Sequence, residues 1–193
     1  MLKVAITGNM GSGKSTVCSV FSTLGIPVFN ADNAAAYEMA NNQIIIDQIK
    51  NLFGATIYKD GIPDRGRIAS LVFNDTNKMA ALNAIMHPAT IHHFKEWCSH
   101  QQASYIIKEA AILFESGTDS GVDKIITVSA PEDLRLQRVT KRNPTWSTDE
   151  IKRRFSLQMD EQQKIKLSDF VIINDDKHSV IEQVLHIHKS LTE

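Results

Sequence analysis

The first thirty residues contain two apolar runs separated by an amphipathic segment. Residues 2–7 are mostly apolar and rich in β-branched side chains, and residues 26–29 form a shorter run of the same kind. Residues 15–24 place their apolar side chains on one helical face, and Gly25 follows where a helix commonly ends. Because continuous apolar runs are typical of parallel strands buried on both faces, this pattern predicts a strand–helix–strand unit.

The same alternation returns in the second half of the chain. It predicts strands at residues 105–108, 124–128 and 170–173, and helices at residues 131–141 and 179–191. Alternating strands and helices indicate helices that pack on a parallel sheet. We therefore expect an α/β fold in which a five-stranded parallel sheet is flanked by helices.

Residues 31–103 interrupt this alternation, because they show several helical patterns and no clear strand. Turn or helix-boundary signals divide them at Asp60-Gly61, at residues 74–77 and at His87-Pro88. We therefore predict a core made of residues 1–30 and 104–193, with residues 31–103 inserted as a helical unit.

A second, shorter insertion is predicted at residues 143–165 within the core, and Asn143-Pro144 opens it. Between Arg135 and Arg154 the sequence has seven lysines or arginines and two acidic residues. This is a local excess of about five positive charges, which favours anion binding. The segment is therefore predicted to be a small basic lid.

The chain as a whole carries no such excess. It has 21 basic and 22 acidic residues among 193, a net charge of −1, so we expect neither nucleic acid nor a membrane surface as a partner. Its two cysteines are far apart, which disfavours a disulfide framework and a zinc site. With no signal-peptide pattern and no long apolar run, the sequence predicts a cytoplasmic protein. We expect a monomer or weak homo-oligomer.

The strongest chemical signal is GNMGSGKST at residues 8–16. It matches G-x-x-x-x-G-K-[ST] and lies between a predicted strand and a predicted helix, as a phosphate-binding loop does. The backbone amides of such a loop surround a phosphate, Lys14 reaches the β- and γ-phosphates, and the Ser15 hydroxyl can ligate Mg²⁺. No guanine-recognition motif of the Asn-Lys-x-Asp type and no Asp-x-x-Gly accompanies it, which favours ATP over GTP.

Asp32 lies just past the second predicted strand, at the edge where ligands bind in open α/β sheets. A carboxylate here can orient a hydroxyl for phosphoryl transfer and accept its proton late in the reaction. Alternatively, Asp32 only caps the helix predicted at residues 33–39. With the helical insertion and the basic lid, the first interpretation favours a small kinase. A nucleotide-gated binding protein without chemistry stays open as another class.

Further segments match, in order, the motifs of one family. They are Asn30-Ala31-Asp32, Asp60-Gly61-Ile62-Pro63-Asp64-Arg65, His87-Pro88, Ala111-Ile112-Leu113-Phe114-Glu115, Arg138 with Arg142, and Ser168 through Asn174. Together with residues 8–16 they make the chain resemble the dephospho-CoA kinase family over nearly its whole length. Most of these motifs are weak when taken singly, but seven in this order are specific.

The resemblance implies a P-loop kinase fold and ATP- and Mg²⁺-dependent phosphorylation of the ribose 3′-hydroxyl of dephospho-CoA, which gives coenzyme A and ADP. It implies that Lys14 and Asp32 are catalytic. The implied ATP-binding residues are Gly11, Ser12, Gly13, Lys14, Ser15, Thr16, Arg138, Arg142 and Asn174, the last near the adenine. The implied acceptor residues are Asp32, Arg65, His87, Leu113, Phe114 and Glu115, and the implied metal-facing residues are Ser15 and Glu109. A kinase of a nucleoside or a sugar acid is the alternative.

Two positions depart from the family pattern. Asn30 stands where the family has an aspartate, and Glu109-Ala110-Ala111 replaces its aspartate–apolar–proline segment. The first change removes a charge near the phosphates but leaves Asp32. The second lengthens the carboxylate by one methylene, which Mg²⁺ tolerates when a water bridges the two. We therefore expect activity to be retained.

Overall fold

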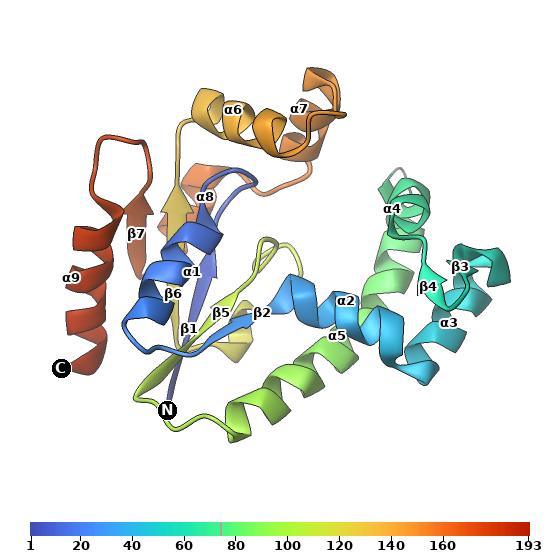
Figure 1. Cartoon of the computed structure of the whole chain (residues 1–193), viewed down its shortest axis with the longest axis horizontal. Coiled ribbons are helices and arrows are strands. Elements are labelled where there is room, and N and C mark those ends of the chain that lie inside the picture. The colour runs from blue at the N-terminus through green and yellow to red at the C-terminus, as the bar shows by residue number, and fades with distance from the viewer. Residues whose placement is uncertain (74) are drawn as a thin grey trace. The chain divides into compact units, whose positions relative to one another are not determined.

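The computed structural model describes residues 1–73 and 75–193. They form two compact units, Met1–Asn30 with Gln101–Glu193, and Ala31–His100 (Figure 1). Of the turn predicted at residues 74–77, Asn74 lies outside the described residues. Its neighbour Asp75 caps a helix, because its Oδ1 accepts the backbone N–H groups of Asn77 and Lys78.

The first unit is built on the predicted five-stranded parallel sheet, whose strand order is β2-β5-β1-β6-β7. The strands are β1 (Leu2–Thr7), β2 (Val28–Asn30), β5 (Tyr105–Glu109), β6 (Lys124–Ser129) and β7 (Phe170–Ile173). The middle of β1 is fully buried, as its apolar run predicts. β2 begins two residues later than expected, since Pro27 has no N–H for the ladder and contributes only its carbonyl, which accepts from Ile107.

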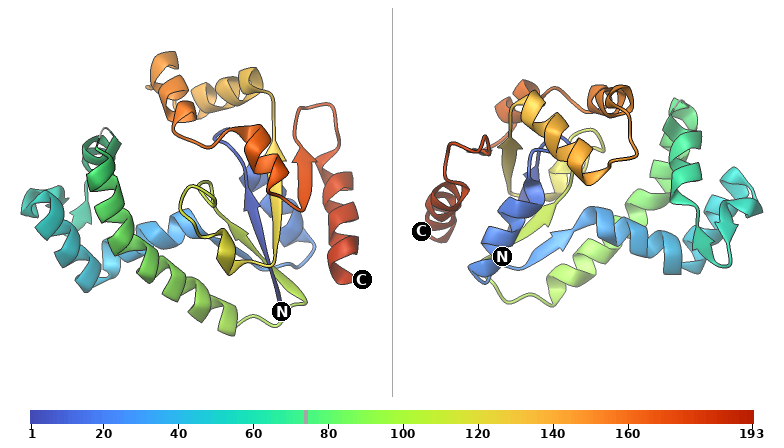
Figure 2. Two further views of the ribbon diagram at one scale, coloured as in Figure 1. Left: turned by 180° about the vertical axis from the view of Figure 1, so that it is seen from behind. Right: turned by 45° about the horizontal axis from the view of Figure 1, so that its top comes forward.

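Helices cover both faces of this sheet. The helices of this unit are α1 (Lys14–Thr23), α6 (Glu132–Arg142), α7 (Thr148–Ser156), α8 (Glu161–Lys166) and α9 (Val180–Thr192), and a 3₁₀ turn, η2, spans Asp119–Gly121. Of these, α6 and α7 lie beyond the carboxyl ends of the strands and not on a face (Figure 1). Figures 1 and 2 show α1 on one face and α8 on the other. α1 packs on α9, and both contribute apolar side chains to the main core under the sheet. The helix that follows the first strand is thus packed firmly into this core.

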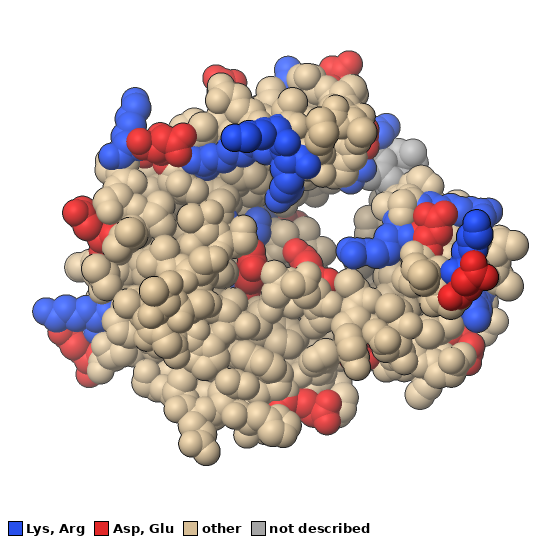
Figure 3. All heavy atoms as spheres, viewed as in Figure 1, with Lys and Arg blue, Asp and Glu red and all other residues tan. Residues whose placement is uncertain are grey.

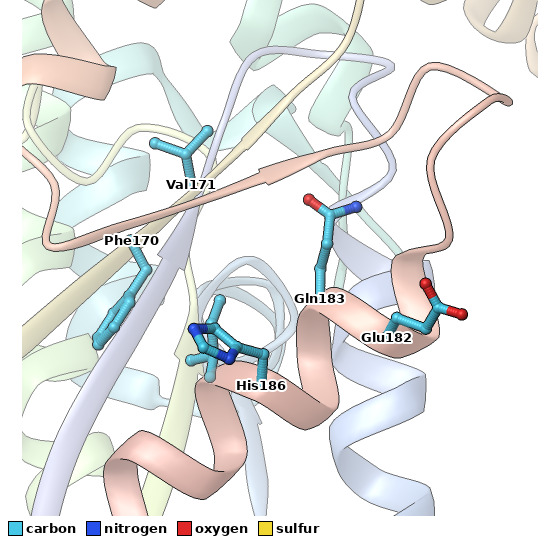
Figure 4. A pocket seen from close by; sticks show the side chains of 6 residues that line it. Phe170, Val171, Glu182, Gln183 and His186 are labelled. Atoms are coloured by element: carbon cyan, nitrogen blue, oxygen red, sulfur yellow. The ribbon is translucent and has the colours of Figure 1, made fainter.

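β7 is an edge strand, and α9 closes part of that edge. The Gln183 carboxamide accepts the N–H of Ile173 at 2.8 Å and donates to its carbonyl at 2.9 Å. Beside it lies a shallow pocket of about 330 Å³, which Figure 4 shows between β7 and α9, lined by Phe170, Val171, Glu182, Gln183, His186 and Ile187. The Gln183 side chain thus satisfies the backbone N–H and C=O groups of Ile173, with which another strand could otherwise pair.

The second unit is mainly helical and has a core of its own. Its elements are α2 (Ala31–Asn41), α3 (Gln43–Phe53), η1 (Ala55–Ile57), β3 (Tyr58–Lys59), β4 (Ile62–Pro63), α4 (Arg65–Phe73) and α5 (Thr76–Ser99). The core contains Ile45, Ile49, Ile57, Tyr58, Ile68, Val72, Leu82 and Met86. β3 and β4 form a small antiparallel hairpin, which the helical patterns of this region did not predict. Asp60 and Gly61 form its turn, both with the positive φ that a tight hairpin requires.

The helix boundary predicted at His87-Pro88 is wrong, because both residues lie inside α5. Proline removes one backbone hydrogen bond and bends a helix, but it does not stop one whose two halves are held by packing. Met86 and Phe94 are buried on either side of Pro88. The Thr90 hydroxyl also donates to the Met86 carbonyl at 2.9 Å. These contacts keep α5 continuous.

Candidate active site

The phosphate loop connects the carboxyl end of β1 to the first turn of α1. Gly11 and Gly13 have φ angles of 83° and 94°, which favour glycine. A Cβ on Gly11 would lie 2.6 Å from the carbonyl oxygen of Arg135, and one on Gly13 would overlap the Asn174 amide. Glycine is therefore favoured at both positions, because the backbone has a positive φ and there is no room for a Cβ atom.

Lys14 lies over its own loop. Its Nζ donates to the Gly8 carbonyl at 2.8 Å and is 3.5 Å from the Asn9 carbonyl. Gly13 occupies the N-cap position of α1, and Ser15 and Thr16 are exposed in its first turn. The buried Ser12 hydroxyl has no hydrogen-bond partner among the described residues. Backbone amides at a helix start, an ammonium group and spare hydrogen-bonding capacity fit a polyphosphate.

Glu109 ends β5 beside the loop and is 9% exposed. Asn30, at the end of β2, is its partner in the strand register, and the Asn30 amide donates to Glu109 Oε2 at 2.7 Å. On α1, burial and the neighbouring Glu109 carboxylate raise the pKa of the Cys18 thiol, while the Lys14 charge partly opposes this. The two departures from the family pattern thus form one hydrogen-bonded pair. An amide facing a carboxylate avoids the repulsion between two carboxylates.

Whether Mg²⁺ fits this site depends on the oxygen atoms that the side chains offer. The described residues contain no group of three or more His, Cys, Asp or Glu side chains placed to hold a metal ion. One hydroxyl, Ser15, and one carboxylate, Glu109, are oxygen ligands of the kind Mg²⁺ takes in phosphate sites. This sparse set fits an ion whose other ligands are nucleotide oxygens and water.

Arg138 and Asn174 donate hydrogen bonds to carbonyl groups of the phosphate loop. The Asn174 side chain donates to the Ser12 carbonyl at 2.8 Å. Arg138, on α6, donates to the Asn174 carbonyl at 3.1 Å and pairs with Asp176 at 2.6 Å. Arg142 is exposed in the last turn of α6. The structure therefore joins Arg138 and Asn174 to the phosphate loop.

The basic segment is less available to anions than its charge count predicts. Arg135 is buried, and its guanidinium lies 4.7 Å from the centre of the Phe155 ring. Arg154 pairs with Glu150 at 2.8 Å and stacks on Trp146. The exposed members are Lys141, Arg142, Lys152 and Arg153. Figure 3 shows lysine and arginine side chains gathered over α6 and α7.

The loop after β5 carries three expected acceptor residues in different surroundings. Leu113 is fully buried and Phe114 is half-buried. Glu115 Oε1 pairs with the Lys164 ammonium at 2.8 Å and accepts the Met159 N–H at 2.9 Å. The sequence gives no signal for Lys164, because a lysine on a polar helix is normally solvated.

The remaining acceptor residues belong to the Ala31–His100 unit. Asp32 is exposed in the first turn of α2, not at the position before the helix where a cap would stand. It follows the end of β2 by two residues along the chain. Arg65 is exposed at the start of α4, and His87 is half-buried in α5.

Comparisons with known proteins agree over nearly the whole chain. The sequence model of the dephospho-CoA kinase family matches residues 2–179. The dephospho-CoA kinase of Bacteroides fragilis is 34% identical over 187 residues, which cover 96% of this chain and 91% of that protein. That of Chlorobaculum tepidum is 36% identical over 196 residues, with 95% and 93% covered.

A crystal structure of a Thermus thermophilus protein superposes with a TM-score of 0.89 at 32% identity, covering 98% of this chain and 96% of that one. None of the described helices is both long and apolar enough to cross a membrane. The family match and the shared fold lead to one conclusion. This chain belongs to the dephospho-CoA kinase family.

Proposed function

We propose that this protein transfers the γ-phosphoryl group of ATP to the ribose 3′-hydroxyl of dephospho-CoA, giving coenzyme A and ADP. The observation that carries the proposal is the glycine loop between β1 and α1, with Lys14 lying over it, in a chain of this family. The loop geometry supports binding of a polyphosphate, and the family supplies the acceptor.

On the donor side, the amides of residues 11–16 bind the β-phosphate at the start of α1. Lys14 leaves the Gly8 carbonyl and stabilises the charge on the transferring phosphoryl group. Arg138, Arg142 and Asn174 bind ATP from the lid side and near the adenine. Arg138 and Asn174 already contact the loop, which supports this assignment.

Mg²⁺ is proposed to accompany ATP, and when bound it neutralises phosphate charge as the γ-phosphoryl group leaves. Ser15 would ligate it directly and Glu109 through water. Asn30 orients the Glu109 carboxylate by the 2.7 Å hydrogen bond, which supports this role.

On the acceptor side, Asp32 orients the 3′-hydroxyl and accepts its proton late in the transfer. A carboxylate of ordinary basicity is sufficient, because a loose transition state demands orientation more than early deprotonation. Arg65, His87 and Phe114 contact dephospho-CoA. Leu113 and Glu115 shape the same loop as Phe114, since the first is buried in the core and the second is held by Lys164.

We further propose that the protein acts in the cytoplasm, as a monomer or weak homo-oligomer, without nucleic acid or membrane partners. A net charge of −1 supports the absence of polyanionic partners. Cys18 and Cys98 are not joined in a disulfide, which suits a reducing compartment.

The test is ADP release with ATP, Mg²⁺ and one acceptor at a time, with the product mass as readout. The acceptors are dephospho-CoA, AMP, CMP, pantothenate, shikimate and gluconate. A gain of one phosphate on dephospho-CoA alone is expected. A Lys14→Ala preparation made in parallel controls for contaminating kinases. Turnover of a different acceptor would replace the proposed substrate, and silence with all six, while ATP still binds, would favour a nucleotide switch.

A further inference from the structure

Lys164 is a buried cation that the proposed reaction does not use. Its side chain is 0% exposed on α8. Its ammonium contacts Glu115 Oε1 at 2.8 Å and the Ala111 carbonyl at 3.3 Å. A buried ammonium is tolerated only when it is paired and hydrogen-bonded. Glu115 is therefore the partner on which the burial of Lys164 depends.

The same carboxylate oxygen also accepts a hydrogen bond from the backbone of the segment between α7 and α8. Glu115 Oε1 accepts the Met159 N–H at 2.9 Å, and Met159 lies between α7 and α8. The Met159 carbonyl in turn accepts from the Asn9 amide at 3.3 Å. Next to it, Gln158 accepts the N–H of Met10 at 2.7 Å. Two successive hydrogen bonds thus run from Glu115 to the phosphate loop.

We infer that Glu115 and Lys164 are positioning residues that couple the loop after β5 to the phosphate loop through Met159, and that Glu115 does not contact dephospho-CoA. The inference refines the proposed function, on which its kinetic readouts rest. The physical reason is that one carboxylate oxygen of Glu115 already accepts hydrogen bonds from the Lys164 ammonium and the Met159 N–H. Loss of its charge would leave Lys164 buried without a counter-ion and weaken the hydrogen bond that holds Met159 beside Asn9.

The experiment compares Glu115→Gln, Lys164→Met and the double variant with wild type. The control is Asp169→Asn, which removes a 2.8 Å ion pair with Lys124 at the amino ends of β6 and β7. Measured are kcat, the KM values for ATP and dephospho-CoA, and the affinity for a fluorescent ADP analogue without turnover. Circular dichroism reports folding.

Each single variant is expected to lower kcat about tenfold and to weaken ADP binding about fivefold, with the KM for dephospho-CoA within about twofold of wild type. The double variant is expected to recover at least about half of the lost ADP affinity, because it no longer buries an unpaired charge and the new carboxamide oxygen still accepts from the Met159 N–H. Asp169→Asn should change none of these values.

A rise of about tenfold in the KM for dephospho-CoA, with ADP affinity intact and no rescue by Lys164→Met, would show direct substrate contact and overturn the inference. If a single variant does not fold, the double variant decides alone by its ADP affinity and its KM for dephospho-CoA. If wild type does not phosphorylate dephospho-CoA, the proposed function fails, yet the ADP affinities still test the coupling.

Discussion

The phosphate loop and the inserted helices hold their candidate residues in opposite ways. The loop follows a strand whose central residues are fully buried, and Arg138 and Asn174 hydrogen-bond to it. In the Ala31–His100 unit, Asp32 and Arg65 are exposed at helix starts. The buried core of that unit is made by other residues.

The difference separates two kinds of function. In the loop, the backbone does the binding, so a substitution that alters its conformation changes folding and binding together. In the helical unit, single side chains act from exposed positions, so activity can be lost while stability is kept. Four substitutions test this division, two of them with a matched control, and a fifth lies far from the proposed chemistry.

The largest effect is expected from Asp32→Ala and Lys14→Ala. Asp32→Ala should lower kcat by about 10²–10⁴-fold with ATP affinity and thermal stability nearly unchanged, because the carboxylate is exposed and acts only on the acceptor. Lys14→Ala should lower kcat by about 10²–10³-fold and also weaken ATP binding. Steady-state kinetics and ATP titration measure both. A fully active Asp32→Ala protein would remove Asp32 from the mechanism.

Gly13→Ala should abolish measurable ATP binding, because the new Cβ overlaps the Asn174 amide that holds the loop. The control is Gly25→Ala, which has a similarly positive φ of 80° but meets no described atom within 4 Å. Both substitutions cost about 1–2 kcal/mol in backbone strain. Only Gly13→Ala should lose binding in a titration with an ADP analogue. Equal loss in both variants would assign the effect to strain alone.

Arg65→Ala should raise the KM for dephospho-CoA about tenfold, as expected for the loss of one charge-assisted contact to a phosphate. Arg67, two residues along α4, is also exposed and donates to the Thr56 hydroxyl at 3.4 Å. Arg67→Ala should leave this KM unchanged, and neither variant should shift the free energy of unfolding by more than about 0.5 kcal/mol. The same KM in Arg65→Ala and wild type would remove Arg65 from the acceptor site.

The smallest effect concerns Asp169, far from the proposed chemistry. Burial raises the pKa of its carboxyl group, but the hydrogen bonds and charge of Lys124 and the Ile125 N–H outweigh this and hold the pKa below its usual value. A depressed folded-state pKa gives stability that is present above about pH 4 and is lost as the pH falls further. Asp169→Asn should therefore lower the unfolding free energy by about 0.5–1 kcal/mol at pH 7.

In acid this difference should shrink, since the wild-type carboxyl becomes protonated and resembles the amide. Urea unfolding at pH 7 and at pH 3 measures it, and an undiminished difference at pH 3 contradicts the role given to the charge. Activity at pH 7 should equal that of wild type.

Local patterns in the sequence were sufficient for much of the fold. The apolar runs located all five parallel strands, with β2 shifted because Pro27 lacks an N–H. The glycine loop was recognised because its spacing reflects backbone conformations that few residues adopt. The His87-Pro88 signal failed because packing around Met86 and Phe94 overrides a local preference.

Contacts between distant segments escaped sequence reasoning. Arg135 counts toward the basic excess of the predicted lid and Lys164 gives no signal in the sequence, yet both are buried against residues remote in the sequence or on another helix. Asn30 and Glu109 read as two separate departures from a family pattern, but neighbouring strands bring them within hydrogen-bonding distance. Nothing in the spacing of these residues reveals such pairs.

What residue order alone specifies here is therefore the alternation of strands and helices, the phosphate loop and the candidate acceptor aspartate, since each depends on residues within one turn or one strand. What required the folded chain is which charges are free to meet a ligand and which are used to hold the site together. Glu115 shows why. A carboxylate has the same chemistry in any sequence, but a buried lysine 49 positions away determines what it binds.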